Sequence, residues 1–154
     1  MSKKLCLICS VGGHLTQLQQ LSEFYMKFDY FFITERTPFT TDMKSREKAY
    51  LMPLINRRQW DFIPRLIYNF IYSIVILMKE RPDIVISTGA LNTVPFCILA
   101  KFSGRKLIFI ESYAKVNTPT VTGKLMYKMA DLFIIQWQQL SKFYPKAVIG
   151  GSIY

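Results

Sequence analysis

The first strand-to-helix passage limits the fold of this chain more than any other segment. A continuous apolar run over residues 5–9 is followed by Ser10-Val11-Gly12-Gly13-His14 and then by leucines at helical spacing. An uninterrupted apolar run predicts a strand buried on both faces, as in a parallel sheet. Adjacent glycines permit a tight turn, and a helix that starts just after such a turn suits a phosphate or diphosphate. The passage therefore predicts an anion-handling α/β site, with a plain tight turn as the alternative.

The rest of the chain alternates between strand-like and helix-like segments. Strands are expected at residues 5–9, 30–34, 84–87, 107–110, 132–135 and 147–149, with a weaker one at 50–54. Helices are expected at residues 15–27, 62–80, 93–102 and 123–129, with a short one near 140–143. This alternation predicts an α/β fold over a single domain, 1–154: a Rossmann-like, doubly wound parallel sheet with helices on both faces. The polar segment 35–48 is expected to be a mobile loop, with a short helix as the alternative.

Charge and composition restrict the partners of the chain. The sequence has 20 Lys and Arg against 10 Asp and Glu, a net charge of +10, and 51% of its residues are apolar. Such a balance favours a polyanionic neighbour, either nucleic acid or an anionic membrane surface. No pattern of basic and aromatic residues matches a nucleic-acid motif, so nucleic acid is not expected.

The cysteines and the single histidine argue against a metal site. Cys6 and Cys9 lie three apart on a predicted strand, so they face opposite sides and cannot readily share a metal or a disulfide. Cys97 lies alone in an apolar helix. A zinc site is not expected, because the sequence has one histidine and no clustered thiols. We expect the three cysteines to be core residues in a reducing compartment.

The helix expected over 62–80 predicts contact with a membrane. Residues 66–78 are apolar nearly all round but fall short of the ~20 residues that span a bilayer, so no spanning helix is expected. The residues expected to touch an anionic bilayer surface are Arg57, Arg58, Trp60, Arg65 and Phe70. A helix buried in the core or against a partner subunit is the alternative.

Polar and glycine residues gather where the predicted strands end. They are Gly12, Gly13 and His14, then Thr88 and Gly89, then Glu111 and Ser112, and finally Gln136 and Trp137. The carboxyl ends of parallel strands share one edge of a sheet, where ligands bind, so these four loops are expected to converge. The glycine turn is no dinucleotide fingerprint, because it lacks G-x-G-x-x-G and no acidic residue ends the second strand in the expected way.

Two side chains at this edge are candidates for chemistry. His14 suits a general base because its ordinary pKa is near neutrality; a helix-entry residue hydrogen-bonded to the backbone is the alternative. Glu111 is expected either to orient a sugar hydroxyl or a neighbouring loop, or to cap the backbone locally.

Several of these segments resemble one family. Residues 10–18, Ser-Val-Gly-Gly-His-Leu-Thr-Gln-Leu, resemble the first loop and helix of the asparagine-linked-glycosylation protein fourteen family and its bacterial capsule and exopolysaccharide relatives. Residues 110–116 resemble its E-S-x-A-R-V stretch, and segments 87–95, 122–131 and 136–137 continue the likeness in order. Lys115 replaces the arginine of that stretch, which keeps the charge but loses bidentate geometry toward a diphosphate.

The resemblance implies the N-terminal, acceptor-side half of a split GT-B glycosyltransferase, similar to MurG cut in two. A separate partner subunit would bind the UDP-sugar donor, and no bound metal or other cofactor is expected. The acceptor would be an undecaprenyl-diphosphate-linked saccharide of capsule or exopolysaccharide synthesis, met by a peripheral protein on the cytoplasmic face of the membrane.

In that reading His14 deprotonates the acceptor hydroxyl. The acceptor and its diphosphate would lie among Gly12, Gly13, Thr88, Gly89, Glu111, Ser112 and Lys115. Two alternatives stay open: a non-catalytic membrane scaffold that activates the partner, and a self-contained small α/β enzyme acting on a phosphorylated metabolite.

Overall fold

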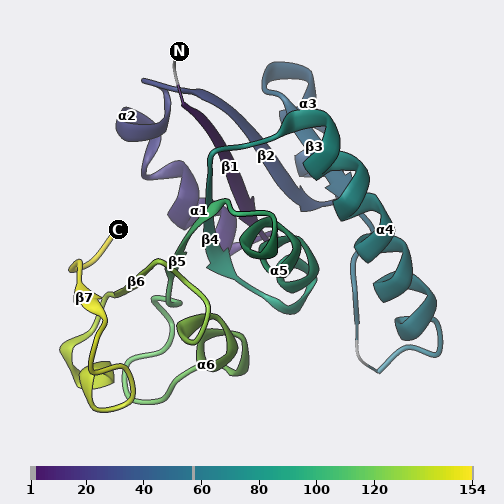
Figure 1. Cartoon of the computed structure of the whole chain (residues 1–154). Helices are drawn as coiled ribbons and strands as arrows, with labels where there is room; N and C mark the ends of the chain where they lie inside the picture. Colours follow the sequence, from purple (N-terminus) through teal and green to yellow (C-terminus); the bar gives the residue numbers. More distant parts are fainter. Residues whose placement is uncertain (1–2, 57, 154) are drawn as a thin grey trace.

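The computed structural model describes residues 3–56 and 58–153. Within these residues, seven strands form one parallel sheet in the order β3-β2-β1-β4-β5-β6-β7 (Figure 1). The strands are β1 (Lys4–Cys9), β2 (Asp29–Glu35), β3 (Ala49–Met52), β4 (Ile84–Gly89), β5 (Lys106–Ile110), β6 (Leu132–Ile135) and β7 (Val148–Ile149). The α-helices are α1 (Gly13–Gln19), α2 (Ser22–Tyr25), α3 (Pro38–Arg46), α4 (Phe62–Glu80), α5 (Val94–Phe102) and α6 (Val121–Tyr127). Two 3-10 helices are η1 (Leu91–Thr93) and η2 (Gln138–Lys142).

Helices cover both faces of the sheet (Figure 1). On one face, residues of α4, α5 and α6 pack against alternate strand residues such as Val85 and Phe109. On the other face, residues of α1, α2 and α3 pack against strand residues such as Leu7 and Phe32. Because β1 is buried on both faces, it is apolar along nearly its whole length. The predicted Rossmann-like, doubly wound α/β fold is confirmed.

The cysteines are core residues, as predicted. All three are buried and free. Cys6 packs under the face covered by α4 to α6, and Cys9 packs on the opposite face. Burial raises the pKa of Cys9 and of Cys97 to about 12, so both thiols stay protonated at neutral pH. In the described part of the chain, no three His, Cys, Asp or Glu side chains are grouped to hold a metal ion.

The helix predicted over 15–27 is interrupted, and α1 and α2 replace it. Between them the Leu21 N–H donates to the Leu18 carbonyl at 3.0 Å, a short-range bond that tightens the chain into a 3-10 turn. The break directs Tyr25 onto β2, where its ring meets Phe32 edge-on with centroids 5.6 Å apart. Packing of this aromatic ring therefore overrides the local helical periodicity.

The segment 35–48 is not the loop that its polarity predicts. It forms α3, the helix weighed as the alternative. Thr37 caps it: the Thr37 hydroxyl accepts from the Thr40 N–H at 3.2 Å, and the Thr40 hydroxyl oxygen accepts from the Thr37 N–H at 2.8 Å. Pro38 occupies the first turn, where its missing N–H costs no helical bond. Local capping thus stabilises a helix that no apolar stripe in the sequence indicates.

Helix α4 has the bounds expected from the sequence, and little of it is buried. It has 19 residues, and only 22% of its most apolar window is buried. By length and composition alone it reaches the threshold for a membrane-crossing helix, which its apolar run of residues 66–78 did not predict. Asn69, Ser73 and Glu80 are nevertheless buried along its inner face. The helix therefore packs against the body of the protein, while its N-terminal half extends away from the sheet (Figure 1).

Candidate functional site

The strand order places β1 and β4 side by side at the centre of the sheet. After β1 the chain enters α1 on one face, and after β4 it enters α5 on the other. A divergence of this kind opens a crevice at the carboxyl ends of the strands, which is where doubly wound folds bind ligands. The predicted residues Gly12, Gly13, His14, Thr88 and Gly89 all lie at this point.

The glycine turn needs its glycine for conformation. Gly12 has φ 80° and ψ −141°, a combination that residues with a Cβ rarely adopt. Its carbonyl accepts from the N–H of Thr16 at 3.1 Å and from the Thr16 hydroxyl at 3.3 Å, which fixes the entry into α1. Both Gly12 and Gly13 are exposed, so their backbone is accessible to a ligand in the crevice.

The imidazole of His14 lies on the backbone of Gly89. A Cβ at Gly89 would stand 3.6 Å from His14 Cε1 and 3.9 Å from His14 Nδ1, and the φ of Gly89 is 108°. The Thr88 hydroxyl donates to the His14 carbonyl at 2.9 Å. The loops after β1 and β4, predicted to converge, therefore meet through these three residues.

His14 is held in an environment that favours its neutral form. Burial lowers the pKa of its imidazole, and a backbone hydrogen bond with Thr88 and the charge of Glu111 oppose this shift without cancelling it. Its Nδ1 is buried with no hydrogen-bond partner among the residues that the structure describes. The contact with Thr88 matches a helix-entry residue, whereas the lowered pKa keeps the imidazole in the neutral form that a general base requires.

An acidic residue that the sequence reasoning set aside also lies at this edge. Strand β2 ends on Glu35, so the expectation that no acidic residue ends the second strand is wrong. Its Oε2 accepts from the Val11 N–H at 3.2 Å. Burial raises the pKa of Glu35, although hydrogen bonds from Val11 and Ser10 act in the other direction. Its position directly after the apolar run 30–34 is the sequence signal that indicates an acidic residue at the end of this strand.

Glu111, at the end of β5, orders a loop. It is 1% exposed, and its Oε1 accepts from the Ser112 N–H and the Thr120 hydroxyl, each at 2.9 Å. Its Oε2 accepts from the Thr120 N–H at 3.2 Å and from the Tyr144 hydroxyl at 2.7 Å. These bonds correspond to the loop-orienting and backbone-capping roles weighed for Glu111. A direct bond to a sugar hydroxyl would have to replace one of them.

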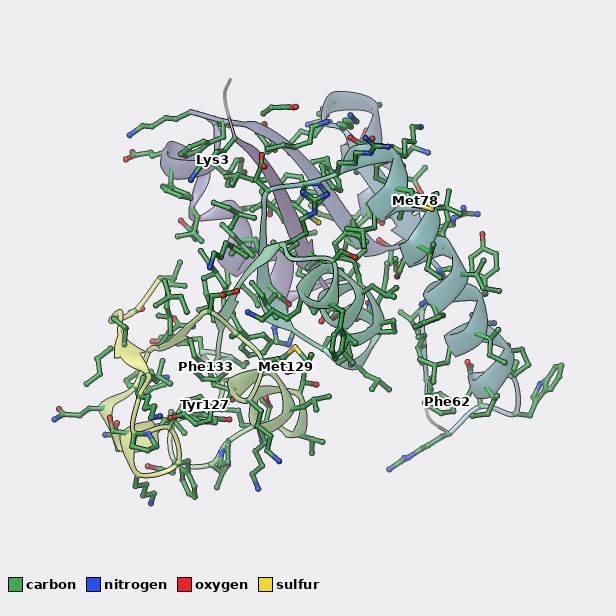
Figure 2. The ribbon with its side chains drawn as sticks, in the orientation of Figure 1. Lys3, Phe62, Met78, Tyr127, Met129 and Phe133 are labelled. Carbon is green, nitrogen blue, oxygen red and sulfur yellow. The ribbon has the colours of Figure 1, made fainter. Side chains whose placement is uncertain are left out.

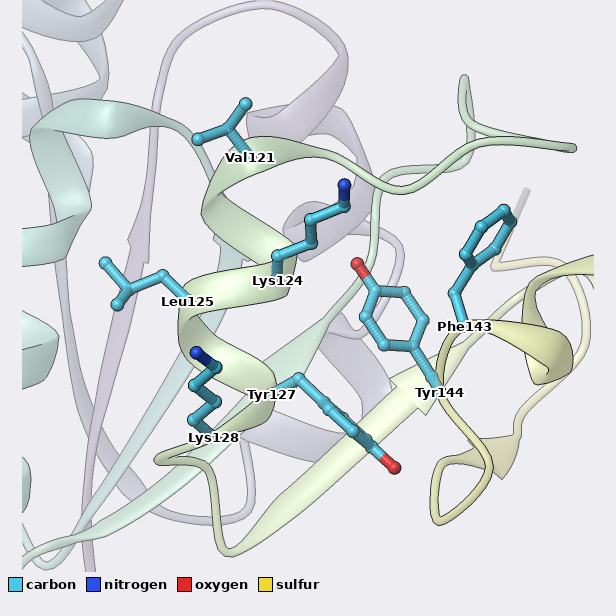
Figure 3. A pocket seen from close by; sticks show the side chains of 7 residues that line it. All are labelled: Val121, Lys124, Leu125, Tyr127, Lys128, Phe143 and Tyr144. Carbon is cyan, nitrogen blue, oxygen red and sulfur yellow. The ribbon is translucent and has the colours of Figure 1, made fainter.

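Gly123 makes the approach of this carboxylate possible. A Cβ at Gly123 would lie 2.0 Å from Glu111 Oε2 and 2.7 Å from the Tyr144 hydroxyl oxygen. The Gly123 N–H also donates to the Thr120 hydroxyl at 2.7 Å and so caps α6. Figure 3 shows Tyr144 beside α6, in a pocket of about 510 Å³ that Lys124 also lines. The sequence reasoning missed this role, because the contacts join residues far apart in the chain.

The loops after β5 and β6 are joined as well. Gln136 Nε2 donates to the Glu111 carbonyl at 2.9 Å, and Trp137 Nε1 donates to the Tyr113 carbonyl at 2.7 Å. The Tyr113 and Trp137 rings lie with their centroids 5.0 Å apart. The four predicted loops therefore associate as two pairs, one after β1 and β4 and the other after β5 and β6.

Ser112 and Lys115 belong to the second pair of loops. The Lys115 N–H donates to the Ser112 carbonyl at 3.0 Å, which forms a turn. Ser112 is partly buried and Lys115 is exposed. Lys115 is thus accessible to an anion, whereas Ser112 bonds to Glu111 and Lys115 within its own loop.

The described residues predicted to contact a membrane lie just before α4 or in its N-terminal half. Trp60 is 93% exposed and Phe70 is 43% exposed. Arg58 is exposed as well, and Arg57 lies outside the described residues. Arg65 differs from these residues, because its guanidinium is already engaged.

Two oxygen atoms hold the side chain of Arg65. Its Nε lies 2.6 Å from Asp61 Oδ2, and its Nη1 donates to the Leu54 carbonyl at 3.1 Å. These contacts fasten the start of α4 to the loop before it. A lipid phosphate would have to compete with both.

Solved structures show a shared fold. MurG from Acinetobacter baumannii superposes with a TM-score of 0.73 at 11% identity, over 89% of this chain and 42% of MurG. UDP-N-acetylglucosamine 2-epimerase from Rickettsia bellii also gives 0.73, at 16% identity, over 99% of this chain and 46% of the epimerase. The chain spans less than half of either protein, so it corresponds to one half of such a two-part fold.

Sequence comparison gives the family. The mouse protein named "UDP-N-acetylglucosamine transferase subunit ALG14" is 28% identical over 99% of this chain and 83% of its own length. The family model described as "Oligosaccharide biosynthesis protein Alg14 like" matches residues 41–153. That match includes the loops after β4, β5 and β6, and the resemblance noted in the sequence is confirmed. The chain belongs to the Alg14 family.

Proposed function

We propose that this chain is the acceptor-side subunit of a two-component glycosyltransferase whose partner subunit binds most of the UDP-sugar donor. The name of the mouse relative, a transferase subunit, supports a division of the enzyme between two chains. The fold supports it too, because it matches less than half of MurG. A separate partner would supply the missing half.

The observation that carries the proposal is the position of His14 against Gly89 at the crevice between β1 and β4. In the proposed reaction the neutral imidazole accepts the proton of an acceptor hydroxyl. The hydroxyl oxygen attacks the anomeric carbon of the donor sugar, the bond from that carbon to the UDP oxygen breaks, and UDP leaves. A base with a pKa near or below neutrality suits this step at neutral pH.

The acceptor in this proposal is a saccharide linked through a diphosphate to a polyprenyl chain, such as undecaprenyl. Gly12, Gly13 and Lys115 are exposed in the loops where the diphosphate would lie. Thr88, Gly89, Glu111 and Ser112 shape the crevice and its loops. The relative is named for N-acetylglucosamine transfer, which makes UDP-N-acetylglucosamine the first donor to test. That name gives no support to the expected capsule or exopolysaccharide pathway.

The protein in this proposal is peripheral, on the cytoplasmic face of a membrane. Helix α4 presents Ile63, Ile67, Ile71 and Met78 to solvent, each more than half exposed. An apolar helix face with basic residues at its ends binds anionic bilayer surfaces. This placement would bring the crevice close to a lipid-linked acceptor.

A two-component transfer assay tests the proposal. The purified chain, alone and with the product of the neighbouring open reading frame, receives UDP-sugars and a synthetic lipid-diphosphate sugar. Transfer only with both proteins is expected. Transfer by this chain alone would mean a self-contained enzyme. Full turnover by a pair carrying His14→Gln would leave this chain as a scaffold for a partner that holds all the chemistry.

A further inference from the structure

An apolar groove lies between α4 and α5. Its α4 wall consists of Leu66, Ile67 and Phe70. Its other wall, from η1 and α5, consists of Leu91, Val94, Pro95 and Ile98. The groove has a volume of about 400 Å³, within the roughly 300–1,000 Å³ of small-molecule sites. Every lining residue is apolar, so the groove suits a ligand segment that carries no charge and no hydrogen-bonding group.

The groove begins where the candidate acceptor site ends. Strand β4 ends at Gly89, Ala90 reverses the chain with φ 83°, and Leu91 then starts η1 and the groove wall. The Thr93 hydroxyl donates to the Ala90 carbonyl at 2.8 Å and holds this reversal in place. A ligand with its polar end beside Gly89 can therefore pass over Leu91 and place an apolar tail in the groove.

The α4 wall of the groove is continuous with the exposed face of that helix. Ile67 is 54% exposed, and Ile71 and Met78, at 57% and 70%, extend the apolar stripe along the helix. Figure 2 labels Phe62 and Met78 toward the two ends of this helix. Arg58 and Lys79, both exposed, lie near its two ends. If this stripe rests on a bilayer, a lipid chain that leaves the groove enters hydrocarbon directly.

We propose that the groove between α4 and α5 binds the first isoprene units of the acceptor's polyprenyl chain. This rests on the proposed function, which supplies an acceptor whose diphosphate joins a sugar to such a chain. An apolar segment of a partner protein would also fit the apolar lining. The continuity of the groove with the Gly89 turn on one side and the α4 stripe on the other favours the lipid.

A pair of matched variants tests the groove. Ile67→Ser alters the groove wall, whereas Ile149→Ser removes a similarly exposed isoleucine on β7, away from α4. Both residues are more than half exposed, so neither change empties the core. The reconstituted pair is assayed in detergent with two acceptors of identical head group, one polyprenyl and one with a short alkyl chain.

The KM ratio of the polyprenyl acceptor to the short-chain acceptor is the quantity compared. Ile67→Ser is expected to raise this ratio about tenfold, the effect of losing most of one side chain's apolar contact. Ile149→Ser is expected to keep the wild-type ratio. Equal ratios in both variants would overturn the proposal.

A labelling experiment separates this proposal from the proposed function. Polyprenyl diphosphate with a diazirine on its second isoprene unit is photolysed with the chain alone, and adducts are mapped by mass spectrometry. Adducts on residues lining the groove, reduced by unlabelled polyprenyl diphosphate but not by inorganic diphosphate, are expected. Adducts only elsewhere on α4, or adducts abolished by the partner subunit, would overturn the proposal that the groove binds the polyprenyl chain. Groove labelling without sugar transfer would overturn the proposed function instead.

Discussion

At one edge of the sheet the surroundings favour the charged form of the ionisable groups, and at the other edge they favour the neutral form. At the amino ends of the strands, Glu80 Oε2 lies 3.1 Å from Lys4 Nζ and 2.7 Å from Lys48 Nζ. The Tyr50 hydroxyl also donates to the Glu80 carboxylate. Burial alone would raise the pKa of Glu80, but these bonds outweigh it and lower the pKa to about 2. Asp131 at the same edge likewise has its pKa lowered to about 2 by its own lysine and backbone partners.

At the carboxyl ends of the strands, burial decides the outcome. It raises the pKa of Cys9 to about 12, raises the pKa of Glu35 and lowers the pKa of His14. Each shift favours the neutral form, and no lysine or arginine is among the causes of any of the three.

This contrast separates stability from function. Buried groups with lysine partners stabilise the fold, whereas groups whose pKa is shifted mainly by burial are costly to keep. Such groups collect at sites that need a shifted pKa. The ion pairs at the amino edge thus serve stability, and the ends of β1 and β4 at the carboxyl edge are where chemistry is expected.

The largest expected effect comes from His14→Gln. If His14 is the base, kcat/KM of the reconstituted pair falls by about 10² to 10⁴. In the wild type the imidazole becomes protonated only as the pH drops below its ordinary pKa of 6.5, because burial lowers that pKa. The pH–rate profile of the wild type should therefore lose activity below pH 6.5, on a limb absent from the variant. An identical profile in both proteins would contradict the role.

Gly123→Ala is expected to disrupt the loop after β5. Its Cβ would collide with the Glu111 carboxylate and the Tyr144 hydroxyl, and moving them breaks buried hydrogen bonds. The free energy of unfolding should fall by about 3 kcal/mol, measured by denaturant titration. Gly104→Ala is the control: Gly104 has φ 77° but nothing within 4 Å of an added Cβ. Its cost should be only about 1 kcal/mol.

Glu80→Gln tests the amino edge. Removing the charge leaves Lys4 and Lys48 without their anion, so the free energy of unfolding at pH 7 should fall by about 2 kcal/mol. The folded pKa of about 2 lies below the ordinary 4.5, so the carboxylate contributes its stability above about pH 4.5 and loses it as the pH falls toward 2. The gap between wild type and variant should close over that window. Turnover per folded molecule should not change, and a loss of turnover would contradict the division between the two edges.

The smallest expected effect concerns the basic end of α4. Arg58→Gln should weaken binding to anionic vesicles by about 1 kcal/mol, less so as salt rises. Arg65→Gln should weaken it by less, because Asp61 already engages that guanidinium. Co-sedimentation at matched ionic strength measures both. A larger loss from Arg65 than from Arg58 would show that the ion pair with Asp61 opens on the membrane.

The sequence predicts the sheet well because strands buried on both faces are apolar throughout. The bounds of β6 and α4 agree with those expected from periodicity. Polarity favoured a loop over the alternative helix at α3, because capping threonines and not an apolar stripe stabilise that helix. The edge that carries the candidate site was also predicted, since strand ends can be located in the sequence.

Which side chains meet at that edge could not be predicted. Glu35 bonds to Val11, and Glu111 bonds to Tyr144. The two residues of each pair are far apart in the sequence and come together only in the folded protein. No local pattern encodes such contacts. The same holds for the close approach at Gly123, where the neighbouring atoms come from distant segments.

The most direct test of the central claim is a proton NMR titration of His14, the only histidine in the sequence. In the chain alone, its imidazole should titrate with a pKa below 6.5. Adding a short-chain lipid-diphosphate sugar should shift its signals, because the acceptor enters the crevice where the ring lies. A pKa at or above 6.5, with signals that the acceptor leaves unmoved, would contradict the assignment of this edge as the acceptor site.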